Sequence, residues 1–309
     1  MGPIITVTNL SKNFGSIKAV DDLTFSVNEG EVYGFLGQNG AGKSTTIRML
    51  LTLVKPSAGS IRIFNKDLHQ HRSEILQQTG AIIEKPDLYQ YLTAFENLHM
   101  MSRLSGKKLT RDQIIGQLSK VGLEDRAFYK VKTFSQGMKQ RLGIACALAH
   151  DPALIILDEP TNGLDPQGIA DVRNLILQLS REERKTVLVS SHLLGEIEMI
   201  ADSMLIIDRG KKVAEGRVAD LLHPASTLVE VTTLDDAAAR QIFLSSTWSA
   251  FLQPGESLLF KMHKEEIPQL ARFCVLNNIS LVSLRPKHTL EDYFLSLTTE
   301  SRHVAAHTN

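Results

Sequence analysis

Cysteine is scarce in this sequence. The 309 residues include two, Cys146 and Cys274, and neither belongs to a Cys-x-x-Cys pair. A zinc cluster or a disulfide framework needs several closely spaced cysteines, so the sequence favours neither. We expect both to be small buried side chains in a reducing compartment.

Long apolar runs and an excess of charge are also missing. No apolar segment approaches the roughly 18–20 residues of a membrane-spanning helix. The first residues, MGPIITVTNL, lack the basic stretch and apolar core of a signal peptide. Lys plus Arg and Asp plus Glu are both 34, so the basic excess of nucleic-acid-binding domains is absent. We expect no nucleic-acid partner, and any membrane role must depend on a partner protein.

What the sequence does contain is an alternation of short apolar segments with helical ones. Two alternating segments near the start, ITVTNLSKNF and DDLTFSV, predict antiparallel strands. Apolar segments then alternate with helical ones. The apolar segments are predicted strands, namely EVYGFLG, TGAIIE, ALIILDEP, TVLVSSH and SMLIID. This pattern predicts an α/β fold with a parallel core sheet and a small antiparallel sheet. Thr93 and Glu96 form a capping box that predicts a helix start.

The pattern also predicts two domains. Residues 1–220 form the α/β domain, and residues from about 85 to 150 form its helical subdomain. Residues 221–309 have the order β-α-β-β-α-β of a ferredoxin-like α+β domain, with WSAFLQ as its second strand. We expect one more helix, TLEDYFLSLT, and a frayed polar tail.

A phosphate-binding loop is the most specific motif. GQNGAGKST fits G-x-x-x-x-G-K-[ST] between a predicted strand and a predicted helix. Backbone N–H groups of the loop point at phosphates, the lysine neutralises their charge, and the serine hydroxyl ligates Mg²⁺. The predicted nucleotide-binding residues are Asn39, Gly40, Ala41, Gly42, Lys43, Ser44 and Thr45.

Carboxylates and a histidine follow two of the later strands. Asp158 ends an apolar strand and suits a metal ion bound through water, and Glu159 is placed to polarise the attacking water. The same pair could instead be a helix cap. His192 ends another strand, where it could reach a γ-phosphate oxygen, although a lone histidine is more often structural.

A second anion-binding helix start lies far from the first. In FSQGMKQR, Ser135 caps a predicted helix, and Gly137 leaves room for close approach. The order of the motifs, with GLDP between Glu159 and His192, resembles that of ABC transporter ATP-binding subunits. The resemblance covers about residues 4–216.

The resemblance implies a function and partners. Such proteins bind and hydrolyse ATP with Mg²⁺, and they act at the cytoplasmic face of the membrane through separately encoded permease subunits. Two copies, or one copy and a similar subunit, enclose ATP head to tail, so that Ser135 and Gly137 serve the partner's γ-phosphate. Phe14 would stack on adenine, unless it is a core side chain. Lys43, Glu159 and His192 would be catalytic, and Asp165 would communicate across the dimer.

Two positions depart from the commonest family pattern. Gln136 replaces a signature glycine, and Glu84 replaces a glutamine that touches Mg²⁺ and senses the permease. An ionised glutamate can ligate metal but cannot donate a hydrogen bond; it could also be a solvated loop acid. The segment AIIEKPDLYQYLTAFENL is similar to the exporter branch for bacitracin, lantibiotics and related drugs. Tyr89 and Tyr91 are candidates for permease contact, and the alternative is that they lie in an ordinary solvated loop. The alternative is a non-transport ABC ATPase that acts on a protein or nucleic-acid machine.

Overall fold

The computed structural model describes residues 2–222, 227–255 and 257–287. The chain divides into two compact units, Met1–Arg217 and Val218–Asn309. Within the described ranges, no helix has both the length and the apolar character that crossing a bilayer requires. The first unit contains all the residues that the motifs single out.

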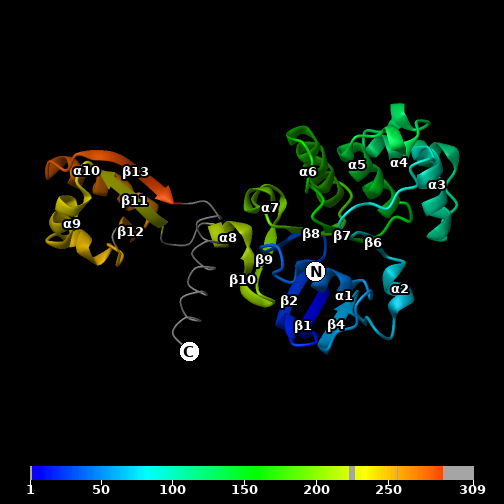
Figure 1. Ribbon diagram of the computed structural model, residues 1–309, viewed down its shortest axis with the longest axis horizontal. Helices are drawn as coiled ribbons and strands as arrows, with labels where there is room; N and C mark the ends of the chain where they lie inside the picture. The colour runs from blue at the N-terminus through cyan, green and yellow to red at the C-terminus, as the bar shows by residue number, and fades with distance from the viewer. Residues whose placement is uncertain (1, 223–226, 256, 288–309) are drawn as a thin grey trace. The chain divides into compact units, whose positions relative to one another are not determined.

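A six-stranded sheet forms the centre of the first unit, in the order β10-β9-β3-β8-β7-β6 (Figure 1). Five strands run parallel, and β10 pairs antiparallel with β9 at one edge. The strands are β3 (Val32–Leu36), β6 (Thr79–Ile82), β7 (Leu154–Asp158), β8 (Thr186–Ser191), β9 (Ser203–Asp208) and β10 (Lys211–Arg217). β3, β7 and β8 are buried along their whole length, which explains their apolar sequences and confirms the predicted parallel core.

An antiparallel sheet shares a hydrophobic core with the central sheet. Its order is β2-β1-β4-β5, and its strands are β1 (Pro3–Phe14), β2 (Ile17–Asn28), β4 (Ala58–Ile63) and β5 (Lys66–Asp67). Apolar side chains of the two sheets pack together; the rings of Phe25 and Phe35 stack with centroids 5.7 Å apart. Each fully buried side chain of this kind contributes about 1.5–3 kcal/mol to the stability of the folded state.

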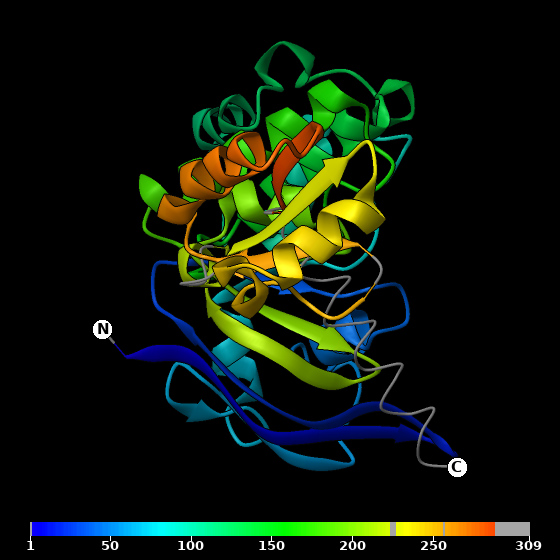
Figure 2. The same ribbon diagram turned by 90° about the vertical axis from the view of Figure 1, so that its left-hand side faces the viewer.

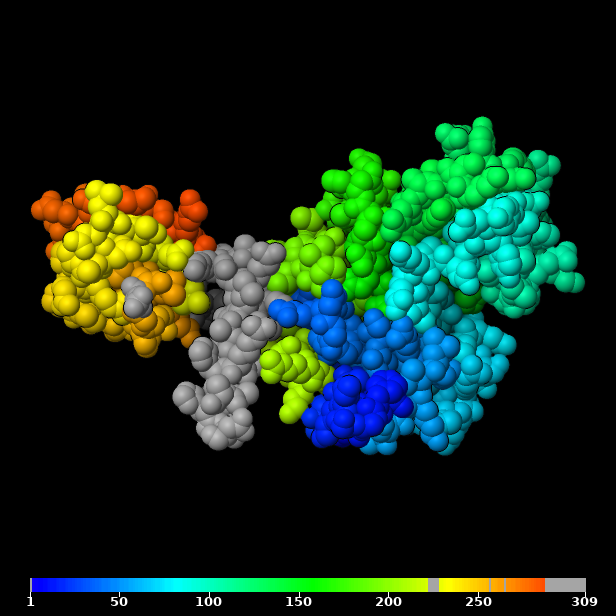
Figure 3. Space-filling view, in the orientation of Figure 1, coloured from blue at the N-terminus to red at the C-terminus, as the bar shows by residue number. Residues whose placement is uncertain are grey.

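Helices make up the rest of the first unit. The helical segment contains α3 (Ala94–Leu104), α4 (Arg111–Lys120) and α5 (Gln136–Ala147). It lies at the end opposite the antiparallel sheet (Figure 2) and forms the cyan-to-green lobe in Figure 3. The predicted capping box is confirmed, because Thr93 and Glu96 exchange hydrogen bonds at the start of α3. The remaining helices are α1 (Lys43–Leu50), α2 (Arg72–Leu76), α6 (Pro166–Arg181) and α7 (Leu194–Ile200).

The first helix is shorter than its sequence suggests. The apolar run predicts a helix to Val54, stopped by Pro56, but α1 ends at Leu50. Thr52 has φ +60° and therefore ends the helix with a left-handed residue, a rare conformation for a β-branched side chain. The Thr52 hydroxyl accepts a 2.6 Å hydrogen bond from Arg72 Nε, a long-range contact that local sequence does not reveal.

The second unit is a small α+β fold with its own core. Its three-stranded antiparallel sheet has the order β12-β11-β13. The elements are α8 (Val218–Leu222), β11 (Thr227–Thr233), α9 (Asp236–Leu244), β12 (Leu258–Met262), α10 (Ile267–Leu276) and β13 (Leu281–Lys287). Phe243 and Phe260 lie at the centre of its core, with their rings edge to face and centroids 4.7 Å apart.

The ferredoxin-like order predicted for this unit is wrong at one element. Most of WSAFLQ is not a strand: Thr247–Ala250 is a 3-10 helix, with Ser246 accepting a hydrogen bond from the Trp248 N–H group. At the end of the segment, Leu252 forms an isolated antiparallel bridge with Phe260 of β12. Trp248 and Phe251 are three residues apart, and such residues share a face of a 3-10 helix. Their rings pack 5.6 Å apart, so apolar burial is achieved without a fourth strand. The predicted helix TLEDYFLSLT and the polar tail lie outside the described residues.

Candidate active site

Four neighbouring strands bring the predicted site residues to one edge of the central sheet. β3, β8, β7 and β6 are adjacent and parallel, so their carboxyl ends meet on the same side. The phosphate-binding loop follows β3, His192 follows β8, Asp158 ends β7, and Glu84 follows β6. This edge is where parallel α/β sheets bind ligands.

The phosphate-binding loop requires glycine at two positions where the backbone is crowded. Gly42 has φ +107°, and a Cβ atom there would lie 2.5 Å from the Ala19 carbonyl oxygen. A Cβ atom on Gly37 would lie 2.6 Å from the Ile207 carbonyl oxygen. Larger residues at either position would displace the loop from the start of α1, whose N–H groups face the loop.

Lys43 lies folded inside this loop. Its side chain is only 5% exposed, and its Nζ atom donates to the carbonyl oxygens of Gly37 at 2.7 Å and Gln38 at 3.3 Å. A buried ammonium group needs such partners because it has left water. The loop therefore presents a fixed positive charge beside the N-terminus of α1, the arrangement that phosphate oxygens favour.

Glu159 bridges Lys43 and His192. One carboxylate oxygen lies 3.1 Å from Lys43 Nζ, and the other lies 2.7 Å from His192 Nδ1. Glu159 has φ +50°, and its backbone N–H group donates to Ser190 Oγ at 2.9 Å. The structure thus gathers the three predicted catalytic side chains, although they come from three separate segments of the sequence.

Asp158 is fully buried and only half satisfied. Its Oδ1 atom accepts a 2.6 Å hydrogen bond from the Ser190 hydroxyl. Its Oδ2 atom is buried and has no hydrogen-bond partner in the described part of the chain. An unpartnered buried carboxylate oxygen is costly, so a site with this feature is suited to an additional cation or water ligand.

Glu84 forms an ion pair with Arg48. It has φ +60°, its side chain is 63% exposed, and its Oε1 atom accepts a short hydrogen bond from Arg48 Nη2. Glu84, Glu159 and Gln136 also line one groove of about 790 Å³. Glu84 therefore has a cationic partner while it stays largely solvated, so a solvated loop acid and a metal ligand both remain predictions for this residue.

The second anion-binding helix start is intact but separate from the loop. Ser135 caps α5 by accepting a 3.2 Å hydrogen bond from the Met138 N–H group. Within the described residues, neither Ser135 nor Gly137 hydrogen-bonds to the phosphate-binding loop of the same chain. Asp165 caps α6 in the same way, through Oδ1 and the Gly168 N–H group.

Phe14 is not a core residue. It ends β1 with half of its surface exposed, and Lys12 Nζ lies 4.8 Å above its ring. The alternative interpretation of Phe14 as a buried side chain is therefore wrong. An exposed aromatic face beside a cation remains a candidate platform for a nucleotide base.

Comparisons with known proteins identify the family. The ABC transporter family matches residues 20–162. The chain is 50% identical to the bacitracin transport ATP-binding protein BcrA of Bacillus licheniformis, over 96% of this chain and 98% of that protein. It is 41% identical to the lantibiotic transport ATP-binding protein SrtF of Streptococcus pyogenes, over 69% of this chain and 90% of that protein.

This chain belongs to the ABC transporter ATP-binding proteins. Among solved structures, an ATP-binding subunit of an ABC transporter matches with TM-score 0.63 and 33% identity, over 71% of this chain and 91% of that one. A dimeric ATP-binding cassette bound to ADP and phosphate matches with TM-score 0.62 and 25% identity, over 69% of this chain and 98% of that one. The predicted family, fold class and ATP-hydrolysing activity are confirmed. The relatives are transport proteins, which favours transport over the alternative of a non-transport ABC ATPase.

Sequence reasoning missed two residues of this ABC ATPase site. Ser190 contacts both Asp158 and Glu159, and Arg48 binds Glu84. Arg48 follows Ser44 by one helical turn, which is a spacing that could have suggested it.

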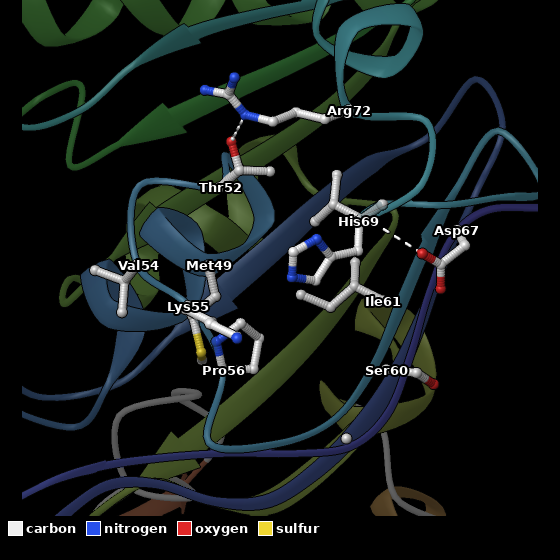
Figure 4. A pocket seen from close by; sticks show the side chains of 12 residues that line it. Met49, Thr52, Val54, Lys55, Pro56, Ser60, Ile61, Asp67, His69 and Arg72 are labelled. Atoms are coloured by element: carbon white, nitrogen blue, oxygen red, sulfur yellow. Dashed lines mark hydrogen bonds between the residues drawn. The ribbon is translucent and has the colours of Figure 1, made fainter.

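A separate cavity of about 260 Å³ lies beyond the end of α1 (Figure 4). It is walled by Met49, Ile61 and Leu68, with hydrogen bonds from Arg72 to Thr52 and from His69 to Asp67 at its border. None of the predicted nucleotide-binding residues lines this cavity.

Proposed function

We propose that this ABC ATPase drives export of a peptide antibiotic or related drug through separately encoded permease subunits. Two copies, or one copy and a similar subunit, close around ATP, and hydrolysis reopens them. The observation that carries the chemistry is the contact of Glu159 with both Lys43 and His192. A base, a phosphate-binding cation and a histidine that can reach a γ-phosphate oxygen are the groups that ATP hydrolysis requires.

Each group has one proposed role. Glu159 accepts a proton from the attacking water, and His192 holds Glu159 in position and contacts the γ-phosphate. Lys43 neutralises charge on the β- and γ-phosphates. Because Lys43 is bound to Glu159 before nucleotide arrives, phosphate oxygens compete with the carboxylate for the ammonium group. Nucleotide binding therefore frees the base. Phe14 stacks on the adenine ring.

The residues present fit a Mg²⁺ ion. The unpartnered Oδ2 atom of buried Asp158 offers an oxygen that lacks any other partner in the described ranges. Ser44 opens α1 beside Lys43, and Glu84 borders the same groove as Glu159. Among the described residues, no group of three or more His, Cys, Asp or Glu side chains is arranged so that it could hold a metal ion by itself. Mg²⁺ needs no such cluster, because it takes one or two protein ligands together with substrate phosphates and waters. When bound, the ion neutralises charge on the β- and γ-phosphates.

The second copy supplies the start of α5. Ser135 and Gly137 leave N–H groups at the helix N-terminus that suit an anion, while no contact links them to the phosphate-binding loop of their own chain. A head-to-tail dimer places this helix start on the partner's γ-phosphate. The dimeric structure that matches this chain is bound to ADP and phosphate, which supports the arrangement.

The permease surface is proposed on the helical segment. Tyr89, Tyr91, Phe128 and Tyr129 are all at least half exposed there, and Phe128 stacks on Phe95 with centroids 5.6 Å apart. Exposed aromatic side chains are enriched at protein–protein contacts. Through this contact the ATPase lies at the cytoplasmic face of the membrane. A bacitracin-like peptide is the proposed cargo, because the BcrA protein of Bacillus licheniformis shares half of its residues with this chain.

The proposal is tested by expressing the chain with the membrane protein encoded beside its gene. Co-purification of the two proteins and increased bacitracin resistance of the host are expected. Resistance should be lost with Glu159→Gln. A membrane partner that co-purifies without conferring resistance would exclude this cargo, and failure to bind any membrane protein would exclude the transport role.

A further inference from the structure

One ion pair connects the helix of the phosphate-binding loop with the loop that carries Glu84. Arg48 lies in the last turn of α1, and Glu84 follows β6. The guanidinium donates from Nη2 to Oε1 of Glu84. Glu84 keeps the left-handed backbone angle of +60° in this arrangement. Each end of the pair thus lies on an element that begins or ends at the active-site edge of the sheet.

Arg48 lies one turn from the serine that opens α1. Residues four apart lie on the same face of a helix, so Arg48 and Ser44 are neighbours on α1. Both are partly exposed, whereas Ile47 and Met49 are buried. The Cβ atoms of Arg48 and Ser44 therefore lie about 6 Å apart, so the residue that binds Glu84 neighbours the proposed metal ligand on the same helix face.

The chemistry of the pair depends on glutamate. A carboxylate forms an ion pair with arginine in addition to the hydrogen bond, whereas the neutral amide of a glutamine could accept the hydrogen bond but form no ion pair. Both side chains are accessible to water, 39% for Arg48 and 63% for Glu84. Exposed pairs of this kind contribute little to stability, so a competing cation can displace the arginine at low cost.

We propose that Arg48 is a positioning residue that holds Glu84 away from the metal site until nucleotide and metal are bound together. Glu84 then exchanges the guanidinium for the metal ion, and Arg48 is left with an uncompensated charge on the surface of α1. This exchange rests on the proposed function, in which Glu84 is a metal residue. The Arg48–Glu84 pair then responds to ATP with bound metal. It does not respond to phosphate alone, which the positive charge of the site attracts in any case.

The test measures ATP affinity of the full chain twice, once with Mg²⁺ and once with EDTA, and takes the ratio of the two affinities. Arg48→Gln removes the competitor, so the ratio rises about two- to fivefold, the range that an exposed ion pair spans. The ATP affinity measured in EDTA stays unchanged. The affinity ratio of Arg48→Lys lies between that of the original chain and that of Arg48→Gln. Lys85→Gln is the matched control: Lys85 borders the same groove but forms no ion pair within the described residues. It should leave the ratio unchanged.

A second series separates the exchange from the metal role of Glu84. Glu84→Gln should lower the ratio, and adding Arg48→Gln to that variant should change nothing further. If Arg48→Gln acts equally in both backgrounds, or alters affinity equally with and without metal, the exchange is wrong. If Glu84→Gln leaves the ratio at its original value, the metal role of Glu84 fails instead. Thermal unfolding of each variant verifies that the chain remains folded.

Discussion

His192 Nδ1 lies 2.7 Å from Glu159 Oε2. The contact joins the carboxyl ends of the neighbouring strands β7 and β8, and the second oxygen of the same carboxylate lies 3.1 Å from Lys43 Nζ. Glu159 therefore hydrogen-bonds to His192 through one oxygen, while the other lies close to the ammonium group of Lys43 without hydrogen-bond geometry. The proposed base becomes available when phosphate oxygens take over the ammonium group of Lys43.

Glu159→Gln tests the base directly. The amide keeps the shape of the side chain but cannot accept the proton of the attacking water. We expect ATP hydrolysis to slow by at least about a hundredfold, the usual contribution of a general base. ATP should then accumulate in a stable dimer, measured by size-exclusion chromatography with light scattering.

A matched control is available on the same side of the fold. Glu198 is an exposed glutamate of α7, so Glu198→Gln makes the same chemical change away from the site. It should hydrolyse ATP at the original rate. A Glu159→Gln chain that remains monomeric in saturating ATP would contradict the sandwich arrangement.

Ser135→Arg tests the second helix start. The arginine fills the space in front of α5, so we expect ATP turnover to be lost while the monomer still binds ATP. Loss of the cap itself destabilises the helix by about 1 kcal/mol, which a domain of ordinary stability tolerates. Ser119→Arg, at an exposed serine of α4, is the control. Weaker ATP binding by the Ser135→Arg monomer would show that the serine acts within its own chain.

Asp158→Asn tests the proposed metal ligand. The asparagine oxygen can keep the bond from Ser190, but the amide nitrogen then replaces the unpartnered carboxylate oxygen. We expect the Mg²⁺ concentration for half-maximal ATPase to rise by about tenfold or more, as for other residues that hold or orient a metal. ATP affinity in EDTA should not change. An unaltered Mg²⁺ dependence would remove Asp158 from the metal site.

Thr93→Ala tests a pH-dependent cap. The backbone N–H group and the hydroxyl of Thr93 donate to Glu96 and lower the pKa of that carboxyl group. A lowered folded-state pKa means that the stabilisation is complete above the unfolded pKa of about 4.3 and is lost as the pH falls through the lower folded value. In Thr93→Ala the pKa of Glu96 should move back upward, and the first amides of α3 should exchange faster. An NMR titration with hydrogen exchange measures both, and Thr93→Ser should preserve the original behaviour.

Local sequence was sufficient for the parts of the fold that depend on local chemistry. The phosphate-binding loop, the Thr93 capping box and the Ser135 cap each depend on residues within a few positions of one another. The parallel sheet followed from its apolar strands, because strands buried on both faces cannot alternate with polar residues. Adjacent strand ends then gathered Lys43, Glu159 and His192.

Features that depend on distant contacts were not predictable. Thr52 ends α1 with a hydroxyl bonded to Arg72, and Arg48 binds a carboxylate 36 residues away. β10 was not predicted because its sequence is mostly polar. The turn between β9 and β10 also lacks the usual Asn-Gly pair, since Arg209 and Gly210 take up the positive φ angles there. The strand expected at WSAFLQ was wrong because its aromatic side chains meet across a 3-10 turn.

Whether a second chain completes each active site is measured by the ATPase rate as a function of protein concentration. If each site is completed by a second chain, the total rate rises with the square of concentration below the dimerisation range. We expect this second-order dependence, together with a transition to first order once light scattering detects dimers. A first-order rate in dilutions where light scattering detects monomers only would contradict it.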